Sequence, residues 1–171
     1  MVSFGDAFKS NNSDLITAKV IDAIANFFSE RQINSYLRGG AVRDALLNRT
    51  PNDLDFVVES HQLFELAQPL ARTLDGRLII LDKSRCIFRI CASSDIDSWQ
   101  VDISQCESGI VDHLKSRDCT IDSMAIPMDS ITDSDPISKI VDPTEGIADL
   151  RKSQIRLNNP QSLEDDPVRI I

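Results

Sequence analysis

The chain has 171 residues, of which 42% are hydrophobic and 26% charged, proportions that are typical of one globular domain. A domain of this size buries about 70% of the surface that its unfolded chain exposes, so its stability requires neither disulfides nor a structural metal. The net charge of -9 is the opposite of what a surface needs to hold nucleic acid by its phosphates. We therefore expect any nucleic-acid partner to be held mainly elsewhere.

Cysteine spacing and hydropathy argue against several classes of protein. The cysteines form no Cys-x-x-Cys pair, and only His61 and His113 could join them in a zinc site, so we expect reduced thiols at Cys86, Cys91, Cys106 and Cys119. No apolar stretch is long enough to span a membrane, and the first residues lack the charged-then-apolar pattern of a secretory signal. These features favour an intracellular, cytoplasmic protein.

The first half of the chain alternates between helical and strand-like patterns. The predicted order is a helix, a strand, a short helix, a strand and a longer helix, over residues 15–28, 33–37, 41–47, 53–58 and 61–74. Thr50-Pro51-Asn52 and Asp75-Gly76 supply the turn chemistry between them. This order predicts an α/β arrangement in which the first helix covers one face of a sheet.

The second half begins with three strand-like segments joined by polar turns, over residues 77–81, 86–91 and 99–104. We expect an antiparallel meander there. A short helical or loop segment over 110–118 then leads to 120–127 and to a polar loop over 129–135. The final piece, 147–171, ends in the apolar run Val168-Arg169-Ile170-Ile171, so we expect the chain to end before its fold does.

Two carboxylates stand one residue apart, at Asp53 and Asp55, beside the apolar run Phe56-Val57-Val58. Side chains at positions i and i+2 of a β-strand project from the same face, so both carboxylates would point to one place. Mg²⁺ prefers oxygen ligands and commonly combines one or two carboxylates with substrate phosphates. The pair therefore predicts a magnesium site, although a lone Asp-x-Asp is more often a solvated strand end.

A glycine-led segment, Gly39-Gly40-Ala41-Val42-Arg43-Asp44, closely precedes the carboxylates. Gly39 and Gly40 would let the backbone approach a bulky anion, and the helix after them would offer unpaired N–H groups to phosphate. Arg43 could bind phosphate oxygens in bidentate fashion, or form a surface ion pair with Asp44 or Asp53. A phosphate binder beside a metal binder indicates nucleotide chemistry. A kinase-type P-loop is the poorer interpretation, because no Gly-x-x-x-x-Gly-Lys-Ser/Thr motif occurs.

Four segments together resemble one protein family. Leu37-Arg38-Gly39-Gly40-Ala41-Val42-Arg43-Asp44-Ala45-Leu46-Leu47, followed by Asp53-Leu54-Asp55, resembles the head domain of bacterial-type (class II) tRNA nucleotidyltransferases and poly(A) polymerases. A second motif, Ser116-Arg117-Asp118-Cys119-Thr120-Ile121-Asp122-Ser123-Met124-Ala125, is similar to the family's Arg-Arg-Asp-Phe-Thr-Ile-Asn-Ala-Met-Ala. A third, Asp142-Pro143-Thr144-Glu145-Gly146-Ile147-Ala148-Asp149-Leu150, resembles its Asp-Pro…Gly-Gly-x-x-Asp-Leu, and a fourth, Asp165-Asp166-Pro167-Val168-Arg169, its Glu-Asp-Pro-x-Arg.

The resemblance implies an α/β (α+β) fold related to DNA polymerase β, with a small mixed sheet flanked by helices. It divides the chain into an N-terminal helical segment (1–35), the catalytic head (36–157) and the truncated start of a nucleotide-recognising neck (158–171). It also implies a reaction in which an RNA 3′-hydroxyl attacks the α-phosphate of ATP or CTP and pyrophosphate leaves. The expected product is tRNA with all or part of its CCA end, with poly(A) synthesis as the alternative.

The resemblance also assigns roles to individual residues. Asp53 and Asp55 would hold two Mg²⁺ ions roughly 3.5–4 Å apart, and Asp102, on a strand that could pair beside them, is a candidate third catalytic carboxylate. The triphosphate and sugar would be bound by Gly39, Gly40, Arg43 and Arg117. Asp166 and Arg169 would read the base edges of the incoming nucleotide. The competing interpretation of Arg117 is a surface ion pair with Asp118, and that of the third motif is a turn followed by helix packing.

The chain departs from the family pattern at several positions. In the second motif the first arginine is replaced by Ser116, the aromatic by Cys119 and the asparagine by Asp122, which puts a carboxylate where a ribose contact is expected. Glu145 replaces a glycine in the third motif, and Asp165 a glutamate in the fourth. Two classes of function follow: an RNA nucleotidyltransferase, or an isolated head that binds nucleotide and Mg²⁺ but extends RNA poorly. The acidic net charge favours the second for this chain.

Overall fold

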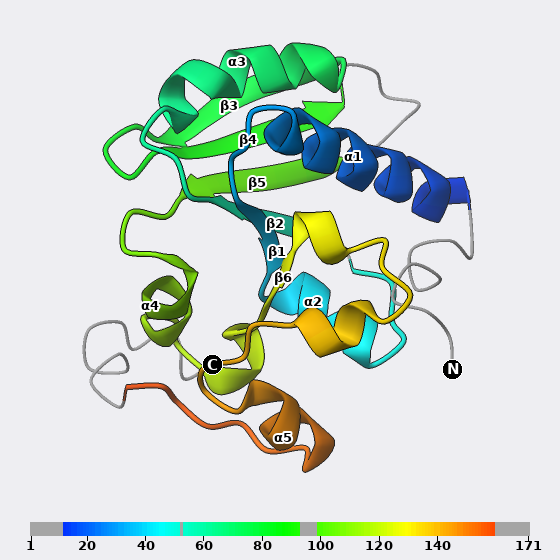
Figure 1. Ribbon diagram of the computed structural model, residues 1–171, viewed down its shortest axis with the longest axis vertical. Helices are drawn as coiled ribbons and strands as arrows, with labels where there is room; N and C mark the ends of the chain where they lie inside the picture. Colours follow the sequence, from blue (N-terminus) through cyan, green and yellow to red (C-terminus); the bar gives the residue numbers. More distant parts are fainter. Residues whose placement is uncertain (1–11, 52, 93–98, 160–171) are drawn as a thin grey trace.

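The computed structural model describes residues 12–51, 53–92 and 99–159 (Figure 1). Its larger elements are α1 (Asn12–Ser29), β1 (Ser35–Arg38), α2 (Gly40–Leu46), β2 (Leu54–Val58), α3 (Leu63–Thr73), β3 (Gly76–Asp82), β4 (Ile87–Ala92), β5 (Gln100–Gln105), α4 (Ile110–Lys115), β6 (Ala125–Pro127) and α5 (Gly146–Arg151). Three short 3₁₀ turns complete the list: η2 (Thr120–Asp122), η3 (Met128–Ser130) and η4 (Pro136–Lys139). Among the described residues, no helix is both long and apolar enough to cross a bilayer.

The strands form one six-stranded mixed sheet in the order β3-β4-β5-β2-β1-β6. Among the described strands only β2 and β5 run parallel, and the other neighbours are antiparallel. The predicted meander is confirmed by the antiparallel pairs β3–β4 and β4–β5. The sheet and its flanking helices confirm the predicted mixed α/β fold.

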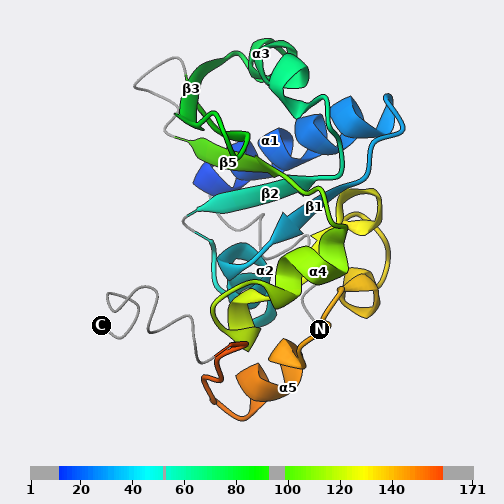
Figure 2. The same cartoon turned by 90° about the vertical axis from the view of Figure 1, so that its left-hand side faces the viewer.

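The two faces of the sheet are covered differently (Figure 2). Alternate residues of β2 point to opposite faces, so Leu54, Phe56 and Val58 join the main core with α1 and α3. Val57 faces the other way and packs with Ile110 of α4 in a second, smaller cluster. Helix α4 covers only part of this second face. Asp55, which shares the face with Val57, is therefore left partly open to solvent.

The ends of several elements differ from the predicted ones. The second meander strand begins at Ile87 because Cys86 has φ 49°, a left-handed conformation that interrupts a strand. Segment 120–127 divides into the turn η2 and the short strand β6, which pairs with β1 at the edge of the sheet. The division of the chain at residues 35 and 157 stays a prediction.

Candidate active site

Four charged side chains form a row across the second face of the sheet. Arg38 of β1 is the Cα partner of Asp55 in β2, Asp55 is the partner of Asp102 in β5, and Asp102 that of Arg89 in β4. Paired residues on neighbouring strands project from the same face. Two carboxylates therefore lie in the middle of the row, with one arginine at each end.

Asp53 lies just before β2 and Asp55 within it, and their neighbours Gln100 and Asp102 are two residues apart on β5, so both carboxylates are on the same side of the sheet. Asp53 is exposed just before the strand, and its Oδ1 accepts a hydrogen bond of 3.2 Å from Gln100 Nε2. Asp55 is half-buried, and its nearest cation is Arg38, with Nη1 4.0 Å from Oδ2. Among residues 12–51, 53–92 and 99–159, no cation forms a short ion pair with either carboxylate, so both keep oxygen lone pairs for a hard cation. This donor set fits Mg²⁺.

Asp102 lies beside Asp55, but its carboxylate already forms an ion pair with Arg89. Its two oxygens accept hydrogen bonds from Nε and Nη2 of Arg89, at 2.7 and 2.8 Å, in a bidentate ion pair. The pKa of Arg89 is raised by this pair. Within the described ranges, no three carboxylate, imidazole or thiol groups converge on a preformed metal site. The structure thus brings Asp102 to the expected place without leaving its oxygens free.

The glycine loop lies directly against the carboxylates. Gly39 has φ +67°, a conformation that favours glycine, and its N–H donates to the carbonyl of Met124 at 2.9 Å. A Cβ built on Gly39 would lie 3.9 Å from Asp55 Oδ2. Helix α2 begins at the next residue, Gly40. The predicted phosphate loop and the predicted metal ligands are therefore neighbours in space.

Arg43 is held by two carboxylates in this structure. Its Nε donates to Asp44 at 3.0 Å, as the ion-pair interpretation expected, and its Nη1 donates to Asp122 at 2.5 Å. Asp122 also accepts from Cys119 Sγ at 3.3 Å. Burial and the charge of Asp122 raise the pKa of the Cys119 thiol to about 11. The carboxylate that departs from the family pattern thus binds the arginine expected to hold phosphate.

Residues 35–156 match the model of one protein family, the poly A polymerase head domain. The chain belongs to this family. A CC-adding tRNA nucleotidyltransferase of Synechocystis sp. is 34% identical over 138 residues, which are 79% of this chain and 30% of the relative. An A-adding tRNA nucleotidyltransferase of Halalkalibacterium halodurans is 27% identical over 168 residues, 90% of this chain and 37% of the relative.

Solved structures similar to this chain are also tRNA nucleotidyltransferases. The Thermotoga maritima CCA-adding enzyme complexed with tRNA matches 90% of this chain with a TM-score of 0.75 and 31% identity, and the match covers 35% of that enzyme. These findings confirm the family resemblance and the fold class. The chain spans about a third of the length of these relatives.

The third motif of this head domain has a structural role. Asp142 accepts hydrogen bonds from the N–H groups of Gly146 and Ile147 at the start of α5, at 2.7 and 2.9 Å. The buried Asp149 accepts from Thr120 Oγ1 at 2.6 Å and from Arg156 Nε at 3.0 Å. The hydrogen bond from Thr120 is the main cause of its lowered pKa. The motif thus ties α5 to the second motif, which fits the turn and helix-packing interpretation.

A cationic pocket next to the carboxylates was missed in the sequence. The α4 pocket, as we name it, has a volume of about 270 Å³, and its charged and ionisable lining residues are Arg38, Asp55, Arg85, Asp102, His113 and Arg117. Burial, followed by the positive charges of Arg38 and Arg117, lowers the pKa of His113 to about 4. One feature of the sequence could have indicated this pocket: Arg38 is a charged residue at the end of a strand that is otherwise largely buried.

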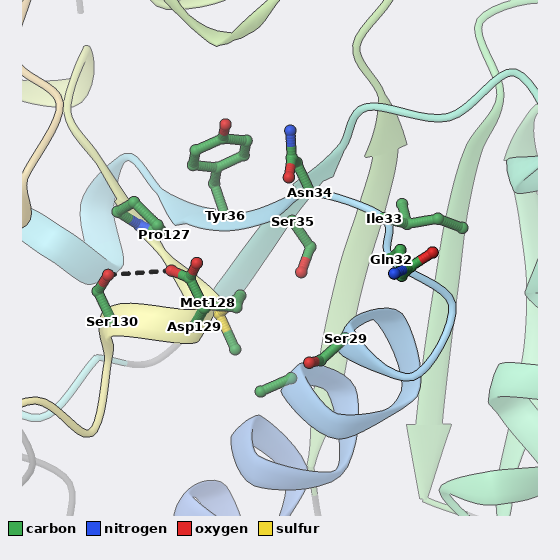
Figure 3. Close-up of a pocket in the computed structure, with 11 residues that line it drawn as sticks. Ser29, Gln32, Ile33, Asn34, Ser35, Tyr36, Pro127, Met128, Asp129 and Ser130 are labelled. Atoms are coloured by element: carbon green, nitrogen blue, oxygen red, sulfur yellow. Dashed lines mark hydrogen bonds between the residues drawn. The ribbon is translucent and has the colours of Figure 1, made fainter.

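A larger cavity of about 470 Å³ lies at the start of β1, between the end of α1 and η3 (Figure 3). The described residues that line it include Asn34, Tyr36 and Asp129 but neither lysine nor arginine, so this lining does not favour a phosphate ligand. Burial and the nearby Glu59 carboxylate raise the pKa of Tyr36 to about 12. The expected base-reading pair, Asp166 and Arg169, lies outside the described residues.

Proposed function

We propose that this chain is the head domain of a template-independent RNA nucleotidyltransferase. It would transfer AMP, CMP or both from ATP or CTP to an RNA 3′ end, with formation of a new bond to the α-phosphorus and release of pyrophosphate. The observation that carries the proposal is the contact between two features. The glycine loop at Gly39 lies within about 4 Å of Asp55, one of two carboxylates that share a face and have oxygens available to a cation.

Asp53 and Asp55 are the residues that would hold Mg²⁺. Both present carboxylate oxygens beside the place where the backbone can approach phosphate, and Mg²⁺ sites in nucleotide enzymes combine such groups. When bound there, the metal supplies activation of the attacking oxygen and charge stabilisation of the leaving one. Asp102 would join this centre only by exchanging its two hydrogen bonds with Arg89 for other partners.

The remaining residues of the head would bind and orient the nucleotide. Gly39 and Gly40 would admit the triphosphate, and Arg43 would bind its oxygens in competition with Asp122. Arg117 would add a cation near the sugar and phosphates. Asp166 and Arg169 would select the base by hydrogen bonds to its edge. Protein side chains, in place of a template strand, would then choose between ATP and CTP.

Addition to tRNA is the favoured reaction because relatives that add CC, A and CCA to tRNA all match this head. The family description, poly A polymerase head domain, makes poly(A) synthesis the second candidate. We propose a cytoplasmic location on the ground that these relatives are tRNA-processing enzymes. The net charge of -9 supports the further proposal that other parts of a longer protein hold most of the RNA.

The proposal is tested with the 171-residue chain, ATP, CTP and Mg²⁺ in isothermal titration calorimetry. We expect nucleotide binding that depends on Mg²⁺ and is lost in Asp53→Asn and Asp55→Asn. Asp133→Asn, an exposed loop carboxylate away from the site, is the matched control and should bind as the wild type does. Absence of binding in the wild type, or full binding in both site variants, would contradict the proposed function.

A second measurement addresses the product. The chain is incubated with tRNA that lacks its 3′ end and with each labelled nucleotide in turn, and the products are separated on a gel. We expect extension of only a small fraction of the tRNA, with the added nucleotide identifying CC, A or CCA activity. Efficient extension would show that the head alone holds RNA well enough, against the charge argument.

A further inference from the structure

The α4 pocket contains cations that the described part of the chain does not satisfy. The Arg38 side chain lines it although the residue is only 9% exposed, and its Nε and Nη1 are buried without a hydrogen-bond partner among the described atoms. Arg117 Nε and His113 Nε2 are likewise buried without a hydrogen-bond partner among the described atoms. Burying a charged group without a partner costs free energy of folding, so this arrangement is typical of a site that binds an anion.

The charge of the pocket also favours an anion. Arg38 and Arg117 contribute two positive charges, whereas Asp102 is neutralised by its bidentate pair with Arg89, and Arg85 is exposed and lies 3.8 Å from Asp82. Asp55 is the one carboxylate left in the lining to oppose them, and its oxygen lies 4.0 Å from Arg38 Nη1. Arg117 is also among the causes that lower the pKa of Arg38, after burial. The arginines therefore stand close enough to repel one another.

The pocket and the glycine loop flank the carboxylates at opposite ends. Because β1 and β2 are antiparallel and Arg38 pairs with Asp55, the glycines after Arg38 run alongside the start of β2, on the side of Asp53. The pocket extends the other way, along β5 from Asp102 to Gln105. The order along the sheet is glycine loop, carboxylates, pocket.

This order fits the two substrates of nucleotidyl transfer. In an in-line displacement the attacking and leaving oxygens lie on opposite sides of the phosphorus. If the triphosphate lies at the glycine loop, the attacking RNA strand approaches from the opposite side, where the α4 pocket lies. The phosphodiester closest to the RNA 3′ end is the first negative charge that this strand brings with it.

We propose that the α4 pocket binds the last phosphodiester of the acceptor RNA through Arg38, with His113 as a second polar contact, while Arg117 at the edge of the pocket stays with the nucleotide. The inference rests on the proposed nucleotidyl transfer, because that reaction places an RNA 3′ end beside the carboxylates. Arginine suits the task, since its planar fork matches phosphate oxygens and stays charged when buried. Arg38 is then a positioning residue for the acceptor, and it is separate from the residues that hold the nucleotide.

The test uses NMR on the 171-residue chain with a minimal acceptor, the dinucleoside phosphate CpC, which carries one phosphodiester. Its partner probe is the methylphosphonate analogue of CpC, which has the same shape and no charge on that group. We expect millimolar CpC to shift the side-chain resonances of Arg38 and His113. The uncharged analogue should bind at least about tenfold more weakly, the loss of one charge-assisted contact of about 1.4 kcal/mol.

Two variants and a control make the result specific. Arg38→Met should remove the discrimination between the two probes, and His113→Gln, at a less buried position, should weaken CpC binding severalfold. Arg72→Gln, an exposed arginine of α3 beneath the other face, should bind both probes as the wild type does. Equal affinity of the wild type for CpC and its analogue, or no shift at Arg38 and His113, would overturn the proposal.

Two further outcomes separate this inference from the proposed function. If CpC shifts only the resonances of Gly39, Gly40 and Arg43, its phosphate occupies the nucleotide site and the α4 pocket assignment is wrong. A titration of the same samples with ATP and Mg²⁺ reports the nucleotide site alone. We expect Arg38→Met to keep its ATP affinity within about twofold. Loss of ATP binding in the wild type would refute the proposed function, whatever CpC does.

Discussion

Replacing Gly146 by alanine should strongly destabilise the head domain, because there is no room for a methyl group. A Cβ at this position would lie 2.2 Å from the carbonyl oxygen of Thr120, 2.9 Å from its carbon and 3.2 Å from Met124 Cγ. The first distance is about 0.8 Å short of the 3.0 Å below which such contacts essentially never occur. The obstacle is backbone, so α5 and η2 must move apart.

Overpacking of this kind costs about 3 kcal/mol when backbone has to shift. For a domain of this size, 1 kcal/mol corresponds to about 2–4 °C in Tm, so we expect a fall of about 6–12 °C in thermal unfolding followed by circular dichroism. Gly40→Ala is the matched control. Its Cβ would meet only the flexible guanidinium of Arg43, at 3.3 Å, and its Tm should stay unchanged or rise slightly. A Tm for Gly146→Ala within 2 °C of the wild type would refute the reasoning.

The remaining predictions concern charges in and around the site. Asp122→Asn removes a competitor for Arg43 and should tighten ATP binding about three- to tenfold by calorimetry; an unchanged Kd would show that this carboxylate does not compete. Burial lowers the pKa of His113 to about 4 from about 6.5 in the unfolded chain, so its contribution to stability is full above pH 6.5 and is lost as the pH drops to 4. The two values correspond to about 3 kcal/mol, and solvent screening of this partly exposed side chain reduces the expected loss to about 2 kcal/mol. Urea unfolding at several pH values should show this slope in the wild type and its absence in His113→Gln. Arg89→Gln should lower stability by about 1 kcal/mol, since it breaks a bidentate pair that is about one-third exposed. Mg²⁺ binding by Asp102 should become detectable by NMR only in this variant.

Features set by neighbours in the sequence could be predicted. Asp53 and Asp55 were expected to share a face because strand side chains alternate, and Gly39 was singled out because a residue without a side chain lets the backbone approach an anion. The meander followed from three short apolar runs with polar turns. These conclusions need only the local periodicity of the chain.

The rest of the site depends on pairings between distant parts of the chain. Arg43 and Asp122 are 79 residues apart, and no local pattern relates them. Arg89 reaches Asp102 only because β4 and β5 pair in one particular register, and a shift of one residue would place Arg89 on the other face. The α4 pocket depends further on how a six-residue helix packs on the sheet. Such contacts reflect tertiary packing, which overrides local signals.

The parallel pairing of β2 with β5 has a consequence for how the site assembles. Asp55 and Asp102 stand side by side, yet α3, β3 and β4 all lie between them in the sequence. Bringing β2 and β5 together closes this long segment into a loop, which costs chain entropy. Contacts within the completed β3–β4 hairpin and α3 offset that cost, so the pairing of Asp55 with Asp102 should be among the last contacts to form during folding. Asp55 and Asp102 therefore come together only when the head domain has folded completely. A growing or partly unfolded chain would lack this pair of carboxylates and could not engage substrate prematurely.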